Sequence, residues 1–291
     1  MSPLTLAAGQ SISIDRATST ERRELSSITK RTLAAVLDHL INRSNQLSFW
    51  GISYKPYWLM SDLATVLALA YAFVFSVHFP SISPVGLIVA IVSALLVYKL
   101  VLELKTAFGK SAARSFLQDC LLVIIPSFLI VSLLFKQPMN LILAFLGTLL
   151  PLYGCIARIG CFLGGCCYGR PSAVGVQYPD RIFESHHGGC RRYSPSLNPK
   201  CRVFPIQLLE AAAQATLFAT LAILIWMRRP MVDCIFWLYL SVYAIVRFLL
   251  DFFRTTSARP RRGPFSEAQC VCIGVCTISL TVLIAAFVGF L

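Results

Sequence analysis

Charged residues are scarce in this chain of 291 residues, because Asp, Glu, Lys and Arg together make up only 13% of it. A soluble domain usually carries about 25% charged residues, which it needs to cover its surface. Hydrophobic residues make up 57% of the chain, and the mean hydropathy is +0.71. The composition therefore excludes an ordinary soluble globular protein and indicates a membrane protein.

The hydrophobic residues are gathered into runs long enough to cross a membrane, which takes about 20 residues in a helix. A single run of this kind would also suit a buried core helix, but a series of runs along most of the chain would not. We therefore expect an all-α polytopic membrane protein with about seven transmembrane helices. The runs lie at about 57–79, 84–104, 116–135, 139–160, 206–227, 233–253 and 269–290.

The formal net charge of +13 would suggest a nucleic-acid partner in a soluble protein. Here the arginines lie between the hydrophobic runs or at their ends, where they meet lipid headgroups. No basic cluster is interleaved with aromatic residues in a separate domain. The membrane itself is therefore the expected partner, and nucleic acid is not.

Residues 1–55 are polar and basic, with little apolar content before Leu33, and we assign them to an arm that precedes the transmembrane domain at 56–291. The first ten residues lack the basic and apolar regions of a secretory signal, so no cleaved signal is expected. Thr18 and Glu21 form a capping box before apolar residues at roughly helical spacing. This pattern predicts an amphipathic helix on the membrane surface, with a disordered basic tail as the alternative.

The stretch from Gly154 to Arg170, at the end of the expected helix 139–160, is unusually rich in glycine, cysteine and arginine. Its glycines recur at a spacing of four, which lets another backbone or a lipid approach closely. The guanidinium groups of Arg158 and Arg170, near the membrane interface and beside glycine amides, suit a phosphate. The alternative is a close-packed helix contact whose arginines extend to the headgroups.

Two later helices also carry charges in apolar surroundings. Arg247, Asp251 and Arg254 are spaced by four and three residues, so they share one helical face. Such charges are costly in a membrane and normally face a polar interior or a site, although a purely structural ion cluster is the alternative. Gln207 and Glu210 lie one turn apart. Glu210 is either a base or a counter-ion, and we favour the counter-ion because arginines outnumber acids here.

The chain has eleven cysteines, and those in apolar runs are predicted to be small packing residues. The others of interest lie in or beside the long loop at 161–205. The loop group consists of Cys166, Cys167, Cys190 and Cys201, together with His186 and His187. Their spacing matches no compact zinc pattern, so neither a metal nor a cofactor is expected. A loop disulfide and a reactive thiolate at Cys166 or Cys167 are the alternatives, the latter without a neighbouring base.

Three motifs, in this order, resemble signatures of the prolipoprotein diacylglyceryl transferase family and cover roughly residues 140–275. The first motif is Arg158-x-Gly160-x-Phe162-x-x-Gly165-x-x-x-Gly169-Arg170. The second is Pro205-x-Gln207-Leu208-x-Glu210. The third runs from Arg247-Phe248 through Phe253-Arg254 to Ser266 and Gln269.

The resemblance implies a multi-pass enzyme of the bacterial cytoplasmic membrane. It would move a diacylglyceryl group from a phosphatidylglycerol-like donor to the lipobox cysteine thiol of a preprolipoprotein, with glycerol phosphate as the leaving group. By the same resemblance, Arg158 and Arg247 would bind the phosphate and take part in catalysis, neutralising the charge that develops. The substrate-binding residues that it implies are Gly160, Gly165, Gly169, Arg170, Gln207, Glu210 and Arg254.

Two guides to membrane orientation disagree. Lys and Arg are concentrated on the side that holds the N-terminus, which the positive-inside rule assigns to the cytoplasm. The resemblance implies instead an N-terminus outside and a C-terminus inside. Arginines that bind a substrate inflate the charge count, so the sequence leaves both orientations open.

The chain departs from the family pattern at two places. Cys161, Gly164 and Cys166 stand where the usual signature has asparagines and a glutamate, and residues 99–118 contain no counterpart of the upstream His-Gly-Gly motif. The alternative to a transferase is therefore a non-catalytic phospholipid-binding or assembly protein derived from this family. A transporter is disfavoured because the sequence shows no internal repeat.

Overall fold

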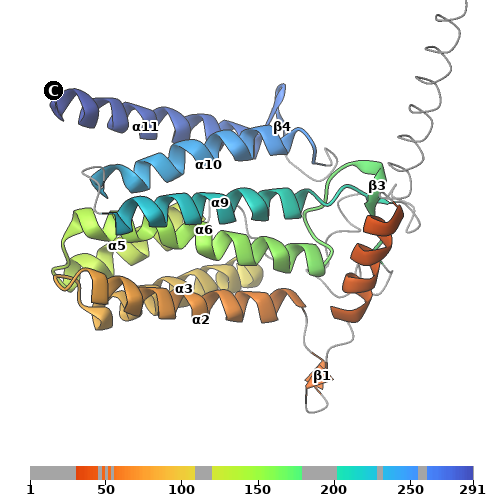
Figure 1. The fold of residues 1–291 in the computed structure, drawn as a ribbon, viewed down its shortest axis with the longest axis horizontal. Helices are drawn as coiled ribbons and strands as arrows, with labels where there is room; N and C mark the ends of the chain where they lie inside the picture. The colour runs from red at the N-terminus through yellow and green to blue at the C-terminus, as the bar shows by residue number, and fades with distance from the viewer. Residues whose placement is uncertain are drawn as a thin grey trace, which may run out of the picture.

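The computed structural model describes most of the hydrophobic part of the chain and part of the arm. The described residues are 31–44, 48–49, 52–53, 56–108, 120–178, 202–227, 232–254 and 261–290. They form a bundle of long helices whose axes run roughly parallel (Figure 1). The capping box at Thr18 and Glu21 and most of the long loop lie outside the described residues.

The long helices are α2 (Pro56–His78), α3 (Pro84–Phe108), α6 (Met139–Leu163), α9 (Ile206–Trp226), α10 (Ile235–Asp251) and α11 (Glu267–Phe290). A shorter apolar segment consists of the π-helix η1 (Cys120–Ile124) and α5 (Ile125–Leu134), and the 3-10 helix η2 (Val232–Cys234) leads into α10. The short strands are β1 (Ser48–Phe49), β2 (Ile52–Ser53), β3 (Pro171–Val176), β4 (Arg261–Arg262) and β5 (Phe265–Ser266).

Six of the described helical segments are long and apolar enough to cross a membrane. The remaining expected run appears as a shorter apolar helix, Leu121–Leu134, and the residues just before it, 109–119, lie outside the described part of the chain. Large apolar side chains such as Val66, Leu100 and Ile284 are about 60% exposed, which suits contact with lipid. The prediction of an all-α polytopic membrane protein is confirmed.

Helix α6 lies at the centre of the bundle and contacts α2, α9 and α10. Three of its glycines each face a different neighbour: Gly147 faces α10, Gly154 faces α9 and Gly160 faces α2. A Cβ atom at any of them would lie 2.9 to 3.0 Å from an atom of that neighbour. Because glycine has no Cβ, all three helices approach α6 closely.

A buried aromatic contact joins α2 to α6 in the apolar part of the bundle. The ring of Tyr71 stacks on Phe145, with ring centroids 5.6 Å apart and planes inclined by 11°. The Tyr71 hydroxyl donates a hydrogen bond of 2.8 Å to the hydroxyl oxygen of Thr148. The pair therefore buries two polar groups without leaving the tyrosine donor unsatisfied.

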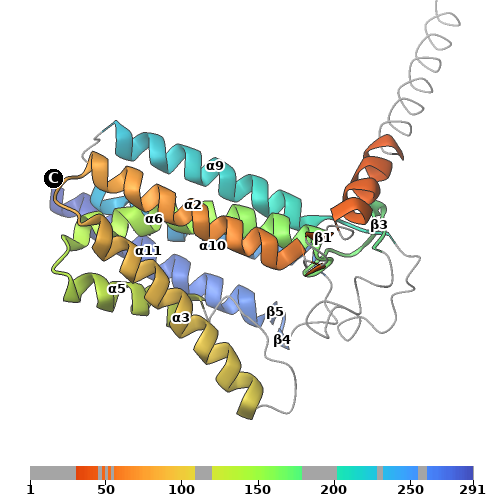
Figure 2. The same ribbon diagram turned by 90° about the horizontal axis from the view of Figure 1, so that it is seen from below.

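A helix at residues 31–44 lies across one end of the bundle, the end where α6 finishes and α9 begins (Figures 1 and 2). Ile41 of this helix is buried in a second apolar cluster. The cluster also contains Phe162, Tyr168, Val176, Tyr178 and Val203. Asp38 accepts hydrogen bonds from the Gln177 N–H at 3.0 Å and from Arg202 at 2.7 Å. The arm is thus helical at 31–44 and forms the short strands β1 and β2 at 48–49 and 52–53, while the position of its helix on the membrane surface stays a prediction.

The C-terminus lies at the opposite end of the bundle (Figure 1). The end that holds the helix at 31–44 also holds the first residues of α2, α9 and α11 and the last residues of α6 and α10. Figure 2 shows that α3 diverges from the other helices toward its C-terminal end. All the residues predicted to form the site therefore lie on helices or turns that meet at one end of the bundle.

We expect Gly147→Ala to destabilise the bundle, because the added Cβ would lie 2.9 Å from backbone atoms of Phe236. Overpacking of this kind costs about 1–3 kcal/mol, which lowers the midpoint of thermal unfolding of the purified protein in detergent. Gly274→Ala on α11 is the matched control, since nothing lies within 4 Å of its added Cβ and alanine favours a helix over glycine. Equal midpoints for the two variants would contradict the close contact of α6 with α10.

Candidate functional site

Helix α6 ends in a Schellman motif. The Cys166 N–H donates to the Cys161 carbonyl oxygen at 3.0 Å, and the Gly165 N–H donates to the Phe162 carbonyl oxygen at 3.3 Å. Gly165 has φ +67°, the left-handed conformation that this motif requires and that glycine adopts without steric cost. The turn directs the following residues back over the end of α6, near Arg158.

Gly169 lies where three backbone segments meet. Its N–H donates to the Phe204 carbonyl oxygen at 2.9 Å, and the next N–H, of Arg170, donates to the Phe253 carbonyl oxygen at 2.9 Å. A Cβ at Gly169 would lie 2.8 Å from the Phe204 oxygen and 3.0 Å from the Phe253 oxygen. Gly169 also bridges to Arg254. This glycine therefore lets the segments around the ends of α6, α9 and α10 lie side by side.

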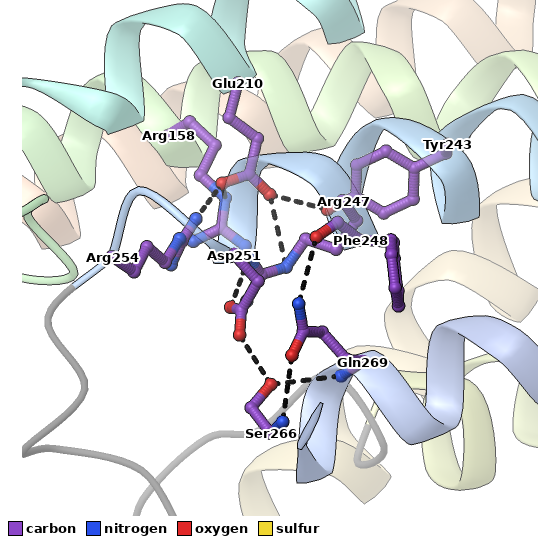
Figure 3. Close-up of polar contacts among 9 residues, drawn as sticks. All are labelled: Arg158, Glu210, Tyr243, Arg247, Phe248, Asp251, Arg254, Ser266 and Gln269. Atoms are coloured by element: carbon purple, nitrogen blue, oxygen red, sulfur yellow. Dashed lines mark hydrogen bonds and ion pairs between the residues drawn. The ribbon is translucent and has the colours of Figure 1, made fainter. Parts of the chain in front are cut away.

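Glu210 of α9 is fully buried at the centre of three guanidinium groups (Figure 3). Arg158 of α6 places its Nε 3.1 Å from Glu210 Oε2, and Arg254, just after α10, contacts the same oxygen. Arg247 of α10 places its Nε 3.7 Å from Oε1, which also accepts a hydrogen bond of 2.8 Å from Tyr243. In this geometry Glu210 is a counter-ion to all three arginines.

A second carboxylate extends the network toward α11 (Figure 3). Asp251 lies 3.1 Å from Arg247 Nη1 and accepts a hydrogen bond from the Ser266 hydroxyl. The Ser266 N–H donates to Gln269 Oε1 at 2.9 Å, and Gln269 Nε2 donates to the Phe248 carbonyl oxygen at 3.4 Å. These contacts fix the orientation of Arg247 and tie the end of α10 to the beginning of α11.

The charges in this network do not cancel. Three guanidinium groups face two carboxylates, which leaves one excess positive charge that no carboxylate in the described part of the chain compensates. The side chains of Arg247 and Arg254 are only 5% and 2% exposed, whereas that of Arg158 is 21% exposed. Among the described residues, none pairs with the two terminal nitrogens of Arg158. The excess charge is therefore accessible at Arg158.

Three cysteines lie beside the arginines. The Sγ atoms of Cys161, Cys166 and Cys167 all lie within 4.8 Å of one another, and the three thiols are free. Hydrogen bonds with the thiols of Cys161 and Cys166 lower the pKa of Cys167 well below its usual value, and nearby Arg254 and Arg158 lower this pKa further. Cys190 and Cys201, which the loop disulfide would also involve, lie outside the described residues.

The structure brings most of the residues expected in the site to one place. Arg158, Arg247, Arg254 and Glu210 form the ion network. Gln207 is buried one turn before Glu210 and donates to the Cys166 carbonyl oxygen at 2.7 Å.

The other expected site residues lie around this network. Gly165 and Gly169 shape the turn beside it, whereas Gly160 lies against Met60 of α2. Arg170 is exposed, and its backbone N–H and carbonyl groups are hydrogen-bonded to Phe253 and Phe204.

Sequence reasoning assigned no role to Tyr243, which donates to the central carboxylate. The signal was present, because Tyr243 precedes Arg247 by four residues and so shares its helical face. Ser266 and Gln269 were suggested by the family resemblance alone. The contact of Ser266 with Asp251 and that of Gln269 with the Phe248 carbonyl oxygen depend on how α11 packs against α10, which helical spacing within one element does not show.

Residues 79–285 match the prolipoprotein diacylglyceryl transferase family. The chain is 28% identical, over 131 residues, to the phosphatidylglycerol–prolipoprotein diacylglyceryl transferase of Geobacter sulfurreducens, which covers 44% of this chain and 45% of that protein. It is 33% identical, over 111 residues, to the protein of the same name from Cereibacter sphaeroides, covering 36% of this chain and 35% of that protein. The matched segments thus span less than half the length of these relatives.

We expect Glu210→Gln to destabilise the protein strongly, because it leaves three buried or half-buried arginines with one fewer counter-ion. Removing one partner of a buried ion pair costs about 3–5 kcal/mol. Glu103→Gln makes the same charge change at an exposed position of α3 and should cost less than about 0.5 kcal/mol. Thermal unfolding in detergent compares the two variants.

The double variant Glu210→Gln with Arg254→Met tests the origin of this loss. It removes one buried cation together with the anion, so it should recover part of the stability lost in Glu210→Gln. Additive losses in the double variant would contradict the counter-ion role of Glu210.

Proposed function

Because the chain belongs to the prolipoprotein diacylglyceryl transferase family, we propose that it is a membrane transferase that moves a diacylglyceryl group from a phosphatidylglycerol-like phospholipid to an acceptor thiol. The names of the two curated relatives give phosphatidylglycerol as their donor and a prolipoprotein as their acceptor. We propose the same donor class for this chain, a lipobox cysteine as its acceptor, and the bacterial cytoplasmic membrane as its location.

The observation that carries this proposal is the excess positive charge beside the unpartnered terminal nitrogens of Arg158. An uncompensated charge in a medium of low dielectric constant costs several kcal/mol, so the site favours an anion of charge −1. A phosphodiester has this charge. Two of its oxygens match the fork of a guanidinium group, which makes arginine a better phosphate ligand than a point charge would be.

The position of the network suits a phospholipid rather than a soluble phosphate. Arg158 and Arg254 lie near helix ends, and the helices that carry them are apolar along the rest of their length. The ends of a membrane-spanning helix are where lipid headgroups lie. A headgroup phosphate at Arg158 would leave the acyl chains lying along the apolar helix surfaces. The charged headgroup and the apolar acyl chains of the donor would thus each contact a surface of matching polarity at this end of the bundle.

The reaction forms one carbon–sulfur bond and breaks one carbon–oxygen bond. The acceptor thiolate attacks the glyceryl carbon that carries the phosphate ester, and glycerol phosphate leaves with a second negative charge. Arg158 would hold the phosphate, and Arg247, oriented by Asp251, would stabilise the charge that develops on it. Glu210 is a positioning residue because it acts through the arginines.

Gln207 supplies a further polar group in the proposed pocket. Its Nε2 is bound to the Cys166 carbonyl oxygen, while its buried Oε1 has no hydrogen-bond partner among the described residues. A buried acceptor without a donor is destabilising. We propose that a hydroxyl of the donor headgroup fills this position.

One observation favours the alternative, a phospholipid-binding protein without turnover. His78 packs against Trp226 at the opposite end of the bundle, with ring centroids 4.5 Å apart, and His39 is exposed on the helix at 31–44. No imidazole therefore contacts the arginine network within the described part of the chain. A protein of this kind would bind the donor but would not release its headgroup.

We expect Arg158→Ala and Arg247→Ala each to lower the rate of transfer about 100-fold or more, since both remove charge stabilisation from the phosphate. The measurement uses purified protein in lipid nanodiscs, phosphatidylglycerol labelled in its headgroup and a lipobox peptide. Released glycerol phosphate and thioether peptide are both quantified. Lys99→Ala, at an exposed position of α3, removes a positive charge outside the network and should leave the rate unchanged.

The same assay separates the two candidate functions. Wild-type rates in Arg158→Ala or Arg247→Ala would contradict the proposed site. Labelled phospholipid that stays bound to the wild-type protein without release of its headgroup would instead identify the non-catalytic alternative.

A further inference from the structure

A group of three thiols lies at the end of α6 and has no part in the site described so far. Cys161 is buried in the last turn of the helix, and Cys166 and Cys167 follow the Schellman turn. Their Sγ atoms lie within 4.8 Å of one another. In the part of the chain that the structure describes, this is the only set of three His, Cys, Asp or Glu side chains whose donor atoms could surround one ion.

The helix end explains only part of this arrangement. In a Schellman motif the residue three positions before the cap contacts the second residue beyond it, and these positions are held by Cys161 and Cys166. Cys167 is not required to join them. It has φ +59°, a left-handed conformation that a residue with a Cβ adopts only at a steric cost. Strain of this kind persists where the surroundings hold a functional geometry.

We propose that Cys161, Cys166 and Cys167 together bind one thiophilic divalent cation. Zinc is the example used for its geometry and in the experiments below. Zinc holds thiolate sulfurs at about 2.3 Å in a tetrahedron, so two sulfurs on one ion lie roughly 3.8 Å apart. Thiols that already lie within 4.8 Å of one another reach this spacing through small side-chain movements. Cys167 is exposed, which gives the ion a route of entry.

The charge of such a site fits its surroundings. Three thiolates and one divalent cation carry a net charge of −1. The arginine network has one excess positive charge, and Arg170, three residues after Cys167, adds another at the same end of α6. Before an acceptor binds, these two positive charges match the thiolate site and one phosphodiester. A fourth thiolate adds one further negative charge, which passes to glycerol phosphate during transfer.

The number of donors suggests what the ion does. Structural zinc sites are closed by four protein ligands, whereas catalytic sites have three and leave one position open. The described residues supply three. Resting on the transferase function proposed above, this inference assigns the fourth position to the acceptor thiol. A thiol that binds such a cation loses its proton, here to water, so no imidazole base is needed.

The step balances without any change in oxidation state. The metal-bound acceptor sulfur attacks the glyceryl carbon, the carbon–sulfur bond forms, and the electron pair of the broken carbon–oxygen bond leaves with glycerol phosphate. Gln207 donates to the Cys166 carbonyl oxygen at 2.7 Å, and Glu210 follows one turn later with its three arginines. The thiols and the proposed phosphate site thus share two elements, the end of α6 and the beginning of α9, while α10 adds its arginines to the phosphate site.

The first experiment measures metal content. Reduced, purified full-length protein in detergent is loaded with zinc, freed of excess ion by desalting and analysed for zinc per chain. We expect one zinc ion, lost in the triple variant Cys161→Ser, Cys166→Ser, Cys167→Ser and retained in Cys276→Ser, a free cysteine of α11. No bound zinc in the wild type, equal zinc in the triple variant, or a disulfide joining two of the three cysteines overturns the proposal.

The second experiment tests the open position with cobalt in place of zinc. Thiolate-to-cobalt charge transfer gives a near-ultraviolet band whose intensity scales with the number of thiolates. Adding a lipobox peptide should raise this band by about one third, as a fourth thiolate joins three, and a peptide with serine in place of the acceptor cysteine should not. An unchanged band with the cysteine peptide overturns the acceptor role.

Arg247→Ala separates this inference from the proposed function. It should keep the zinc and the response to the peptide while losing transfer. If the wild-type protein binds zinc and the peptide thiol but transfers no diacylglyceryl group, the proposed function fails and the metal site stands. If transfer proceeds at the wild-type rate in the triple serine variant, the proposed function stands and the assignment of the acceptor thiol to the metal ion is overturned.

Discussion

One buried carboxylate, that of Glu210, holds together arginines from two other helices, and the arrangement of the bundle around the site depends on it. Each of these ions would cost several kcal/mol to bury alone, so the helices that carry them cannot slide past one another without separating the charges. Arg158 comes from α6 and Arg247 and Arg254 come from α10 and its end, while Glu210 comes from α9. The glycine contacts of α6 bring these helices close enough for the ions to meet.

The same network also explains how a phosphate would be distinguished from other ligands. Two of the three arginines are almost completely buried and are oriented by Glu210 and Asp251, whereas Arg158 is partly exposed and keeps two nitrogens free of described partners. A phosphodiester of charge −1 neutralises the excess charge. In the proposed reaction the leaving glycerol phosphate gains a second negative charge, so the arginines interact more strongly with the transition state than with the donor, which is the condition for catalysis.

Most of the helices and part of the site could be predicted from the sequence, because they depend on the spacing of residues within a single helix. The hydrophobic runs predict the helices, and the shared face of Arg247 and Asp251 follows from helical spacing. An excess of arginines over acids favoured the counter-ion interpretation of Glu210, which the observed geometry matches. The convergence of Arg158, Glu210 and Arg254 on one point could not be derived in this way, because these residues lie on different elements and their distances depend on packing.

The cysteines show where spacing alone is a poor guide. Compact zinc patterns are recognised by pairs of ligands at short, regular intervals, and Cys161, Cys166 and Cys167 do not fit them. Their proximity arises from the Schellman turn at Gly165 and from the left-handed backbone of Cys167. The spacing of residues in the sequence predicts neither of these backbone conformations.

The same positions bear on the departures from the family pattern that the resemblance implies. By that resemblance, Cys161 and Cys166 replace other polar residues, and residues 99–118 contain no counterpart of an upstream histidine motif. A thiolate-bound cation would deprotonate the acceptor thiol by coordination, whereas a histidine would do so as a base. In the proposed mechanism the thiols would thus activate the acceptor in place of the histidine that the resemblance implies, while the arginine network would bind the donor, as the family motifs imply.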